Sequence, residues 1–234
     1  DRLIEAVEKT HNPSVMGLDP RPELIPPELE AKIRRAEDLP KAYLAFNQRL
    51  LEACQGLVPA VKFQVACYEA FGLDGLKALK ESQSIAQELG YFVINDAKRS
   101  DIASSATFYA RAWLQDGAWT GDALTINPYL GRDSIEPFME LAKEHDKMLF
   151  VLLRTSNPGA KDFQDLVLED GRRLYEVVGE QLQTWGESRK GKYGYSDLGA
   201  VVGATWPEEG GKLRQALPSV YFLVPGYGSQ GGTA

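Results

Sequence analysis

Histidine and cysteine are scarce in this sequence, which holds two of each among its 234 residues. His11 and His145 stand alone, without the further ligands of a zinc site or the partners of a Ser–His–Asp triad beside them. The sequence therefore argues against metallohydrolases and histidine-based acyl transfer, and it leaves acid–base chemistry to lysine, aspartate or glutamate. Cys54 and Cys67 form no CxxC pair, which favours buried free thiols in a reducing compartment.

Long hydrophobic runs and a basic excess are also missing. No apolar run approaches the roughly 20 residues that cross a bilayer, and the N-terminal segment has neither the basic start nor the apolar core of a secretory signal. Acidic residues outnumber basic ones by 33 to 26, a net charge of -7, which works against binding along a nucleic-acid backbone. We therefore expect a soluble, cytoplasmic protein that binds neither membranes nor nucleic acid. The charge balance still allows a small phosphorylated ligand, because one local cationic or amide-lined pocket suffices.

Short apolar runs alternate with stretches of helical period along the chain. Seven runs are expected to be strands: 14–19, 57–63, 91–96, 122–127, 147–154, 198–204 and 220–225. Amphipathic helices are expected at roughly 39–54, 72–89, 101–118, 133–145, 165–185 and 207–216. Almost wholly apolar strands that alternate with helices are typical of a parallel sheet covered by helices, so the sequence predicts an α/β fold.

The ends of the expected strands favour a (β/α)8 TIM barrel over a doubly wound sheet. No GxGxxG motif follows the first strand, which ends in GLDPRPE. Polar residues instead recur at the carboxyl ends of the strands, where a barrel builds its site: Asp19, Lys62, Asp96, Lys98, Asn127 and Ser156. Only GYGSQGGTA, residues 226–234, follows the seventh strand. We therefore expect residues 1–234 to form a single barrel domain that lacks its C-terminal phosphate loop, helix and eighth strand.

Two connections are expected to be peripheral. The charged segment 26–40 is expected to be a solvated helical insert between the first strand and its main helix. The polar segment 185–197 is expected to be a mobile surface loop.

The segment INDAKRSDI, residues 94–102, carries the densest set of charged candidates. Asp96 and Lys98 are two residues apart at a strand end, so their side chains are expected to share a face, and Asp101 follows near the next helix. A purely structural arrangement is the alternative, in which Asp101 caps the helix and the other two form a solvated pair. Lys62, at the end of the preceding strand, favours a catalytic role, because so many charges at one barrel mouth are costly without a task.

The motifs of the chain resemble those of the orotidine 5'-phosphate decarboxylase family. They are GLD, AVK, the DxKxxDI of residues 96–102 and VPGxGxQGG, in that order. TINPYLG at 125–131 and RTSNPGA at 154–160 resemble the longer bacterial branch. The resemblance runs through essentially the whole sequence. It implies decarboxylation of orotidine 5'-phosphate to uridine 5'-phosphate and CO₂, the last step of de novo UMP biosynthesis, without a metal or other cofactor.

The resemblance also implies catalytic roles for individual residues. Lys62 and Asp96 match two members of the family's charged array. Lys98 matches a third, the proton donor to C6 of the pyrimidine, and Asp101 completes the array. Asp101 and Ile102 match residues that reach into the neighbouring subunit's site, which implies that the active unit is a homodimer.

The remaining matches concern substrate binding. Asp19 matches a ligand of a ribose hydroxyl, and Ser105 falls where the family often has threonine. Ser156 matches the residue that bonds the pyrimidine amide, and Gln230 matches the side chain that closes over the phosphate. The family's phosphate-binding arginine, which follows the eighth strand, has no counterpart in the sequence.

These residue types suit the reaction on physical grounds. Loss of CO₂ from C6 leaves a carbanion in the ring plane that no π system delocalises, so its stabilisation falls to fixed charges. A protonated Lys98 can stabilise and then protonate the carbanion, and ionised Asp96 and Asp101 would keep Lys98 charged. Two alternatives stay open. One is a phosphosugar lyase or aldolase of a related barrel family, which uses a metal or a Lys98 Schiff base, and the other is a catalytically silent nucleotide-binding barrel.

Overall fold

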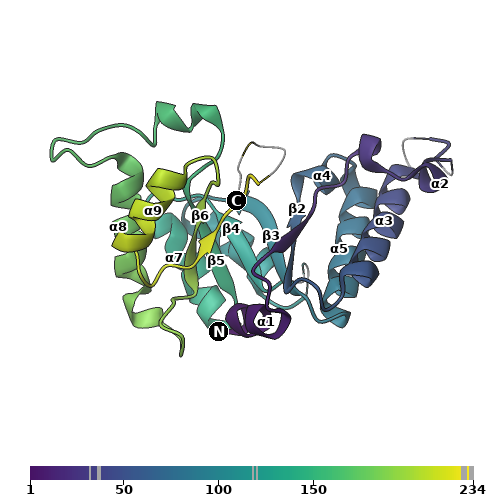
Figure 1. Ribbon diagram of the computed structural model, residues 1–234, viewed down its shortest axis with the longest axis horizontal. Helices are drawn as coiled ribbons and strands as arrows, with labels where there is room; N and C mark the ends of the chain where they lie inside the picture. Colours follow the sequence, from purple (N-terminus) through teal and green to yellow (C-terminus); the bar gives the residue numbers. More distant parts are fainter. Residues whose placement is uncertain (32, 36–37, 118, 120, 228–230, 232–234) are drawn as a thin grey trace. The chain divides into compact units, whose positions relative to one another are not determined.

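The computed structural model describes residues 1–31, 33–35, 38–117, 119, 121–227 and 231 (Figure 1). Its strands are β1 (Val15–Leu18), β2 (Ala60–Gln64), β3 (Phe92–Arg99), β4 (Ala123–Ile126), β5 (Met148–Arg154), β6 (Leu198–Val202) and β7 (Phe222–Leu223). Its α-helices are α1 (Arg2–Thr10), α2 (Pro27–Glu30), α3 (Leu39–Cys54), α4 (Ala66–Glu69), α5 (Gly72–Glu88), α6 (Ala103–Leu114), α7 (Arg132–Glu144), α8 (Leu174–Gly186) and α9 (Pro207–Ala216). Short 3₁₀ helices are η1 (Pro22–Leu24), η3 (Pro158–Asp162) and η4 (Glu187–Arg189). Among the described helices, none is long and apolar enough to cross a membrane.

The order of the strands identifies the fold class. The hydrogen-bonded order is β1-β2-β3-β4-β5-β6-β7, and the registers described between neighbours are parallel. An order that follows the chain is that of a (β/α)8 barrel, whereas a doubly wound sheet reverses its order at a switch point. The α/β fold of the TIM-barrel class is therefore confirmed. No eighth strand lies among the residues that the structure describes.

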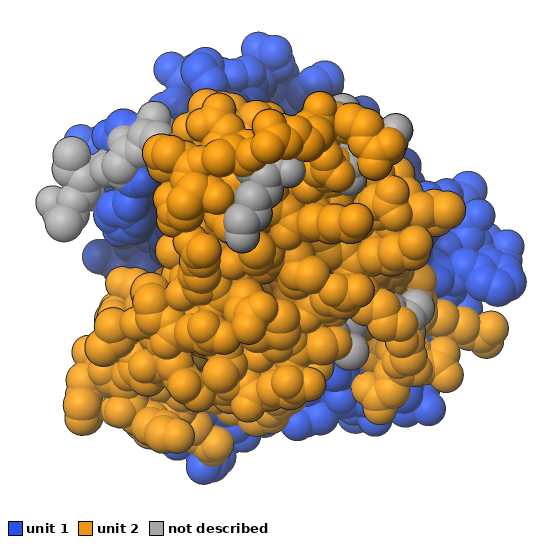
Figure 2. Space-filling view, turned by 90° about the vertical axis from the view of Figure 1, so that its right-hand side faces the viewer, with its two compact units in different colours: residues 1, 98–110, 125–234 blue, residues 2–97, 111–124 orange. Residues whose placement is uncertain are grey.

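Contacts divide the chain into two compact units, which Figure 2 shows in different colours. Unit 2 consists of Arg2–Ala97 and Arg111–Leu124, and unit 1 consists of Asp1, Lys98–Ala110 and Thr125–Ala234. Two strands, β3 and β4, continue from one unit into the other. The single barrel domain over residues 1–234 stays a prediction.

Unit 2 is built from β1, β2 and most of β3, with α3 packed against α5. Helix α3 begins with Pro40 in its first turn and ends before Gly56, whose φ of 76° favours glycine. Its buried Leu51 accepts, through its carbonyl oxygen, a hydrogen bond of 2.6 Å from the hydroxyl of Tyr91. Burial raises the pKa of Tyr91 to about 12, so this hydroxyl stays a donor at neutral pH.

Unit 1 contains the paired strands β5, β6 and β7 with their helices. Val151 of β5 lies opposite Ala200 of β6, and Val201 of β6 lies opposite Leu223 of β7. Helix α8 packs against β5, β6 and α9. The side chains of β5 and β6 are mostly buried, as expected for parallel strands covered by helices.

Two helices differ in extent from their predictions. Helix α6 was expected over 101–118 and spans Ala103–Leu114, and α8 was expected from residue 165 and begins at Leu174. The chain before α8 forms η3 and then an antiparallel bridge between Val167 and Arg173. Backbone pairing there occupies the polar groups that a helix would use, which sequence periodicity does not reveal.

Both peripheral connections are more ordered than the sequence suggests. In segment 26–40 the helix α2 is a single turn, and Leu29 is buried beside Tyr43 of α3, so the insert is not simply solvated. In segment 185–197 the side chain of Arg189 binds both carboxylate oxygens of Asp197, at 2.7 and 2.6 Å. Leu29 thus packs the first segment against α3, and Nη2 of Arg189 joins the second to α7 by a hydrogen bond of 2.9 Å to the carbonyl oxygen of Met139.

Glycine substitutions test the packing of unit 2. A methyl group at Gly75 of α5 would overlap the backbone carbonyl oxygen of Tyr68, whereas Gly211 of α9 has open space around it. We expect Gly75→Ala to lower the free energy of unfolding by about 1–3 kcal/mol. The control Gly211→Ala is expected to raise it by up to about 1 kcal/mol, because alanine is the better helix former. Urea unfolding followed by circular dichroism measures both, and an unchanged midpoint for Gly75→Ala would contradict the packing described.

Candidate active site

Lys62 of β2 is the centre of a charged cluster in unit 2. Its Nζ lies 3.1 Å from Oδ2 of Asp96 on β3 and 3.5 Å from Oδ1 of Asp19, which follows β1. The amide of Gln64 donates a hydrogen bond of 3.2 Å to the same oxygen of Asp96. The side chains of Lys62 and Asp96 are 14% and 10% exposed, so solvent ions screen their attraction only weakly.

The register of the parallel strands explains why these side chains meet. Gly17 lies opposite Lys62, and Gln64 lies opposite Asp96. Residues two apart on a strand face the same side, so Lys62 and Gln64 both reach the carboxylate of Asp96. Three predicted site residues are therefore brought together: Asp19 directly after β1, Lys62 within β2 and Asp96 within β3.

Lys98 lies in unit 1, near the end of β3. Its φ is 49°, in the left-handed region, and its backbone N–H donates a hydrogen bond of 2.9 Å to the hydroxyl of Thr125 on β4. A non-glycine residue in this region costs on the order of 1–3 kcal/mol, and such strain concentrates at functional sites. Asp96 and Lys98 were expected to face the same side because residues two apart do so in an extended strand. Because Lys98 departs from that conformation, the shared face stays a prediction.

Asp101, Ile102 and Ser105 lie at the start of α6. The carboxylate of Asp101 accepts a hydrogen bond of 2.8 Å from the adjacent N–H of Ile102. A capping aspartate would reach the N–H of a residue two or three positions on, so this bond is not the helix cap that the structural alternative requires. Ile102 is 54% exposed, and Ser105, one turn later, is exposed as well.

Ser156 lies in the loop that follows β5. The side chain of Gln164 bonds both the backbone N–H and the hydroxyl of the preceding Thr155, at 3.0 and 2.8 Å. The carbonyl oxygen of Ser156 accepts a hydrogen bond of 3.2 Å from the hydroxyl of Thr205. Gly203 lies so close behind that a Cβ there would come within 2.8 Å of the Ser156 backbone. The loop is therefore fixed through its backbone, and the side chain of Ser156 is half-buried.

Two further candidates complete the comparison with the sequence. Gln230, predicted to close over a phosphate, lies outside the described residues. The side chain of Asn127 accepts a hydrogen bond of 3.0 Å from the N–H of Tyr129, which is the local turn that asparagine commonly forms. Sequence reasoning missed Arg154 and Trp206, although Arg154 opens the RTSNPGA motif and is the one charged residue of the apolar strand β5.

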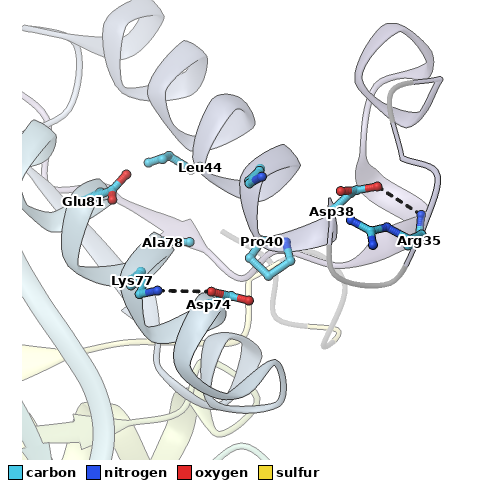
Figure 3. Close-up of a pocket in the computed structure, with 9 residues that line it drawn as sticks. Arg35, Asp38, Pro40, Leu44, Asp74, Lys77, Ala78 and Glu81 are labelled. Atoms are coloured by element: carbon cyan, nitrogen blue, oxygen red, sulfur yellow. Dashed lines mark hydrogen bonds and ion pairs between the residues drawn. The ribbon is translucent and has the colours of Figure 1, made fainter.

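A separate hollow of about 390 Å³ lies between α3 and α5 in unit 2 (Figure 3). Lys77 Nζ lies 3.4 Å from Asp74 Oδ1 there, so these charges neutralise each other. The carboxylate of Asp38 accepts hydrogen bonds from the backbone N–H groups of Arg34 and Arg35, which lowers the pKa of Asp38. No residue predicted for the site lines this hollow.

Cys54 and Cys67 are free, as predicted, and each is half-buried rather than enclosed in the core. Burial raises the pKa of the Cys67 thiol, and the nearby Asp19 carboxylate adds to the effect. A raised pKa keeps Cys67 in its unreactive thiol form at neutral pH. Over the described part of the chain, no group of three or more histidine, cysteine, aspartate or glutamate side chains could hold a metal ion.

Known proteins resemble this chain in sequence and in fold. The model of a family described as "Orotidine 5'-phosphate decarboxylase / HUMPS family" matches residues 16–234. A relative named orotidine 5'-phosphate decarboxylase, from Clostridium perfringens (strain SM101 / Type A), is 43% identical over 234 residues, which are 100% of this chain and 80% of the relative. Another of that name, from Rhodopirellula baltica, is 43% identical over 240 residues, covering 100% of this chain and 79% of the relative.

Solved structures agree with these relatives. The structure of Leishmania donovani OMP decarboxylase is 34% identical with a TM-score of 0.78, over 97% of this chain and 78% of the other. The structure of Leishmania donovani UMP synthase is 34% identical with a TM-score of 0.81, over 100% of this chain and 46% of the other. The resemblance seen in the motifs is thus confirmed over almost the whole sequence, and the chain belongs to the orotidine 5'-phosphate decarboxylase / HUMPS family.

Proposed function

We propose that this chain decarboxylates orotidine 5'-phosphate to uridine 5'-phosphate and CO₂, the last step of de novo UMP biosynthesis, with no cofactor. The observation that carries the proposal is the set of charged residues that β1, β2 and β3 bring together. Lys62 is held between Asp19 and Asp96, and the DxKxxD motif that continues from Asp96 is intact in a chain whose relatives carry the decarboxylase name.

The chemistry follows from charge. The bond between C6 and the carboxylate carbon breaks, CO₂ leaves, and the electron pair stays on C6 in the plane of the ring. The ammonium of Lys98 stabilises this pair and then donates a proton to C6, which yields uridine 5'-phosphate. Asp96 and the partner subunit's Asp101 keep Lys98 protonated, and Lys62 neutralises Asp96. Because Lys62 already contacts Asp19 and Asp96, this part of the array needs little reorganisation during the reaction.

The other predicted residues bind the substrate. Asp19 accepts a hydrogen bond from a ribose hydroxyl, and Ser105 supplies a hydroxyl for substrate binding. Ser156 bonds the amide edge of the pyrimidine, and Gln230 closes over the phosphate. Support for Ser156 comes from its loop, whose backbone is fixed by Gln164 and Thr205.

A homodimer is part of the proposal. Asp101 and Ile102 enter the partner subunit's site, so each active site draws residues from two chains. The exposed apolar side chains around them support this, since Ile102, Phe108 and Tyr109 are 54%, 69% and 39% exposed. We also expect the enzyme to act in the cytoplasm, where its free thiols stay reduced.

The phosphosugar lyase is the second candidate, because the matching family includes the HUMPS group as well as the decarboxylases. The relatives of 41–43% identity carry the decarboxylase name, which favours the first candidate. Borohydride trapping of a Lys98 adduct with substrate, or loss of activity in chelator, would favour the lyase instead.

Substitution of Lys98 tests the proposed chemistry. The unmodified protein is expected to convert orotidine 5'-phosphate in the presence of chelator and without added cofactor, measured by the change in absorbance. Lys98→Ala is expected to lower turnover by at least about 1,000-fold, because it removes both the charge and the proton at C6. Lys77→Ala, on the exposed face of α5, is the matched control and is expected to keep full activity. Near-normal turnover by Lys98→Ala would end its assignment as proton donor.

Mixing two inactive variants tests the shared site. Lys98→Ala and Asp101→Asn subunits, exchanged in equal amounts, are expected to recover about a quarter of the activity of the unmodified protein. Half of the dimers then contain both variants, and each of these has one site with an intact Lys98 and an intact Asp101. Subunit exchange is verified by native mass spectrometry of subunits of different mass. If mixed dimers form and no activity returns, the two residues do not serve a site shared in this way.

A further inference from the structure

Arg154, the last residue of β5, is a wholly buried cation of unit 1. Its Nη2 lies 3.2 Å from Oδ1 of Asp165 and 3.9 Å from Oε1 of Glu209. Its guanidinium carbon lies 4.1 Å from the ring centre of Trp206 and 5.0 Å from that of Tyr175. One side chain thus joins the loop after β5, helix α8 and the start of α9, elements that pack together in unit 1 (Figure 1).

The arrangement is costly for a side chain that only fills space. Nε and Nη1 of Arg154 are buried without a hydrogen-bond partner among the described residues. A buried donor that finds no partner destabilises the fold, and well-packed apolar residues often replace buried ion pairs without loss. Packing alone would be served as well by a methionine, so the charge and the planar shape call for another explanation.

That explanation lies in the two residues that follow. The ring of Trp206 stacks on Arg154, and its Nε1–H donates a hydrogen bond of 2.8 Å to the carbonyl oxygen of Thr155. Asp165, paired with Arg154, follows directly after Gln164, which binds the N–H of Thr155. Both backbone groups of Thr155 are therefore held by side chains whose own positions depend on Arg154, and Ser156 is the next residue.

We infer that Arg154 is a positioning residue that sets Ser156 against the pyrimidine ring, with Trp206 as the contact that transmits its position. The inference rests on the proposed function, in which Ser156 bonds the amide edge of the base. A hydrogen bond to the base discriminates only when its donor is held to within a fraction of an ångström. The Arg154 cluster supplies that restraint from behind the loop without touching the substrate.

Three variants separate the parts of the cluster. Arg154→Met removes the charge and keeps most of the volume, and Arg154→Lys keeps the charge and removes the planar fork. Trp206→Phe keeps an aromatic ring on Arg154 and removes the donor to Thr155, so it tests the inference even if Arg154→Met does not fold. Arg214→Met is the matched control, because Arg214 stacks on Phe222 at 4.3 Å and donates a hydrogen bond of 2.8 Å to the carbonyl oxygen of Val220.

The measurement compares ligands with and without the base. We expect Arg154→Met and Trp206→Phe to lower kcat/KM for orotidine 5'-phosphate by about 10- to 100-fold, and to raise the inhibition constant of uridine 5'-phosphate by a similar factor. Ribose 5-phosphate, which has no base, is expected to keep its inhibition constant. Arg154→Lys is expected to resemble Arg154→Met, and Arg214→Met is expected to lower the urea midpoint without changing the ratio of the two inhibition constants.

A double-mutant cycle with Ser156→Ala decides between positioning and general stability. If Arg154 and Trp206 act through Ser156, Arg154→Met or Trp206→Phe is expected to lower kcat/KM by less than about a further twofold in the Ser156→Ala variant. Losses of kcat/KM that multiply in the double variants would overturn the inference. Equal increases in the inhibition constants of ribose 5-phosphate and uridine 5'-phosphate would overturn it as well. If the unmodified protein neither converts orotidine 5'-phosphate nor binds uridine 5'-phosphate, the proposed function fails and the inference fails with it. If the unmodified protein turns over its substrate, and the losses of kcat/KM in the double variants are the products of the single losses, the inference fails and the proposed function stands.

Discussion

An ammonium held between two carboxylates is the interaction on which the proposed chemistry depends. Lys62 and Asp96 are mostly withdrawn from water, and each would be expensive to desolvate alone. Their pairing follows from the parallel register, which sets Gln64 opposite Asp96 and so brings Lys62, two residues earlier, to the same carboxylate. A site made in this way needs the whole of β2 and β3 in the correct alignment. A slip of one residue would turn the charges to the other face of the sheet, into the layer where the apolar side chains pack.

Strand β3 also contains Lys98, whose backbone has a strained, left-handed conformation. Asp96 still has the register of β3, whereas Lys98 two residues later adopts the left-handed backbone, with its N–H held by Thr125. The strand pairing at Asp96 and the hydrogen bond from the N–H of Lys98 to Thr125 restrain the backbone of Lys98. In the proposed reaction, a lysine whose backbone is restrained in this manner stabilises the developing carbanion with little rearrangement of the protein.

Periodicity was sufficient to predict the elements whose packing is regular. The helices at 39–54 and 207–216 were predicted with the limits that the structure has, and each predicted strand contains most of an observed one. Prediction failed where contacts distant in sequence decide the backbone. The segment before α8 has apolar spacing suited to a helix, yet it pairs Val167 with Arg173. The left-handed backbone of Lys98 was equally invisible, because lysine has no intrinsic preference for it. For the site, strand ends predicted the cluster of Asp19, Lys62 and Asp96, whereas the stacking of Arg154 on Trp206 joins residues far apart in the chain.

The clusters around Lys62 of β2 and Arg154 of β5 stabilise a cation in different ways. Lys62 is a compact charge matched by carboxylates, which suits a group that must hold its charge beside a reacting centre. Arg154 is a planar cation beside the rings of Trp206 and Tyr175, and two of its nitrogens have no hydrogen-bond partner among the described residues. Stacking fixes the plane of a guanidinium, and through Trp206 that plane fixes a backbone carbonyl. In the proposed reaction, the Lys62 cluster holds charge for the transition state, and the Arg154 cluster directs the hydrogen bond of Ser156 to the base. The fold therefore spends stability at both places, for two different requirements of one substrate.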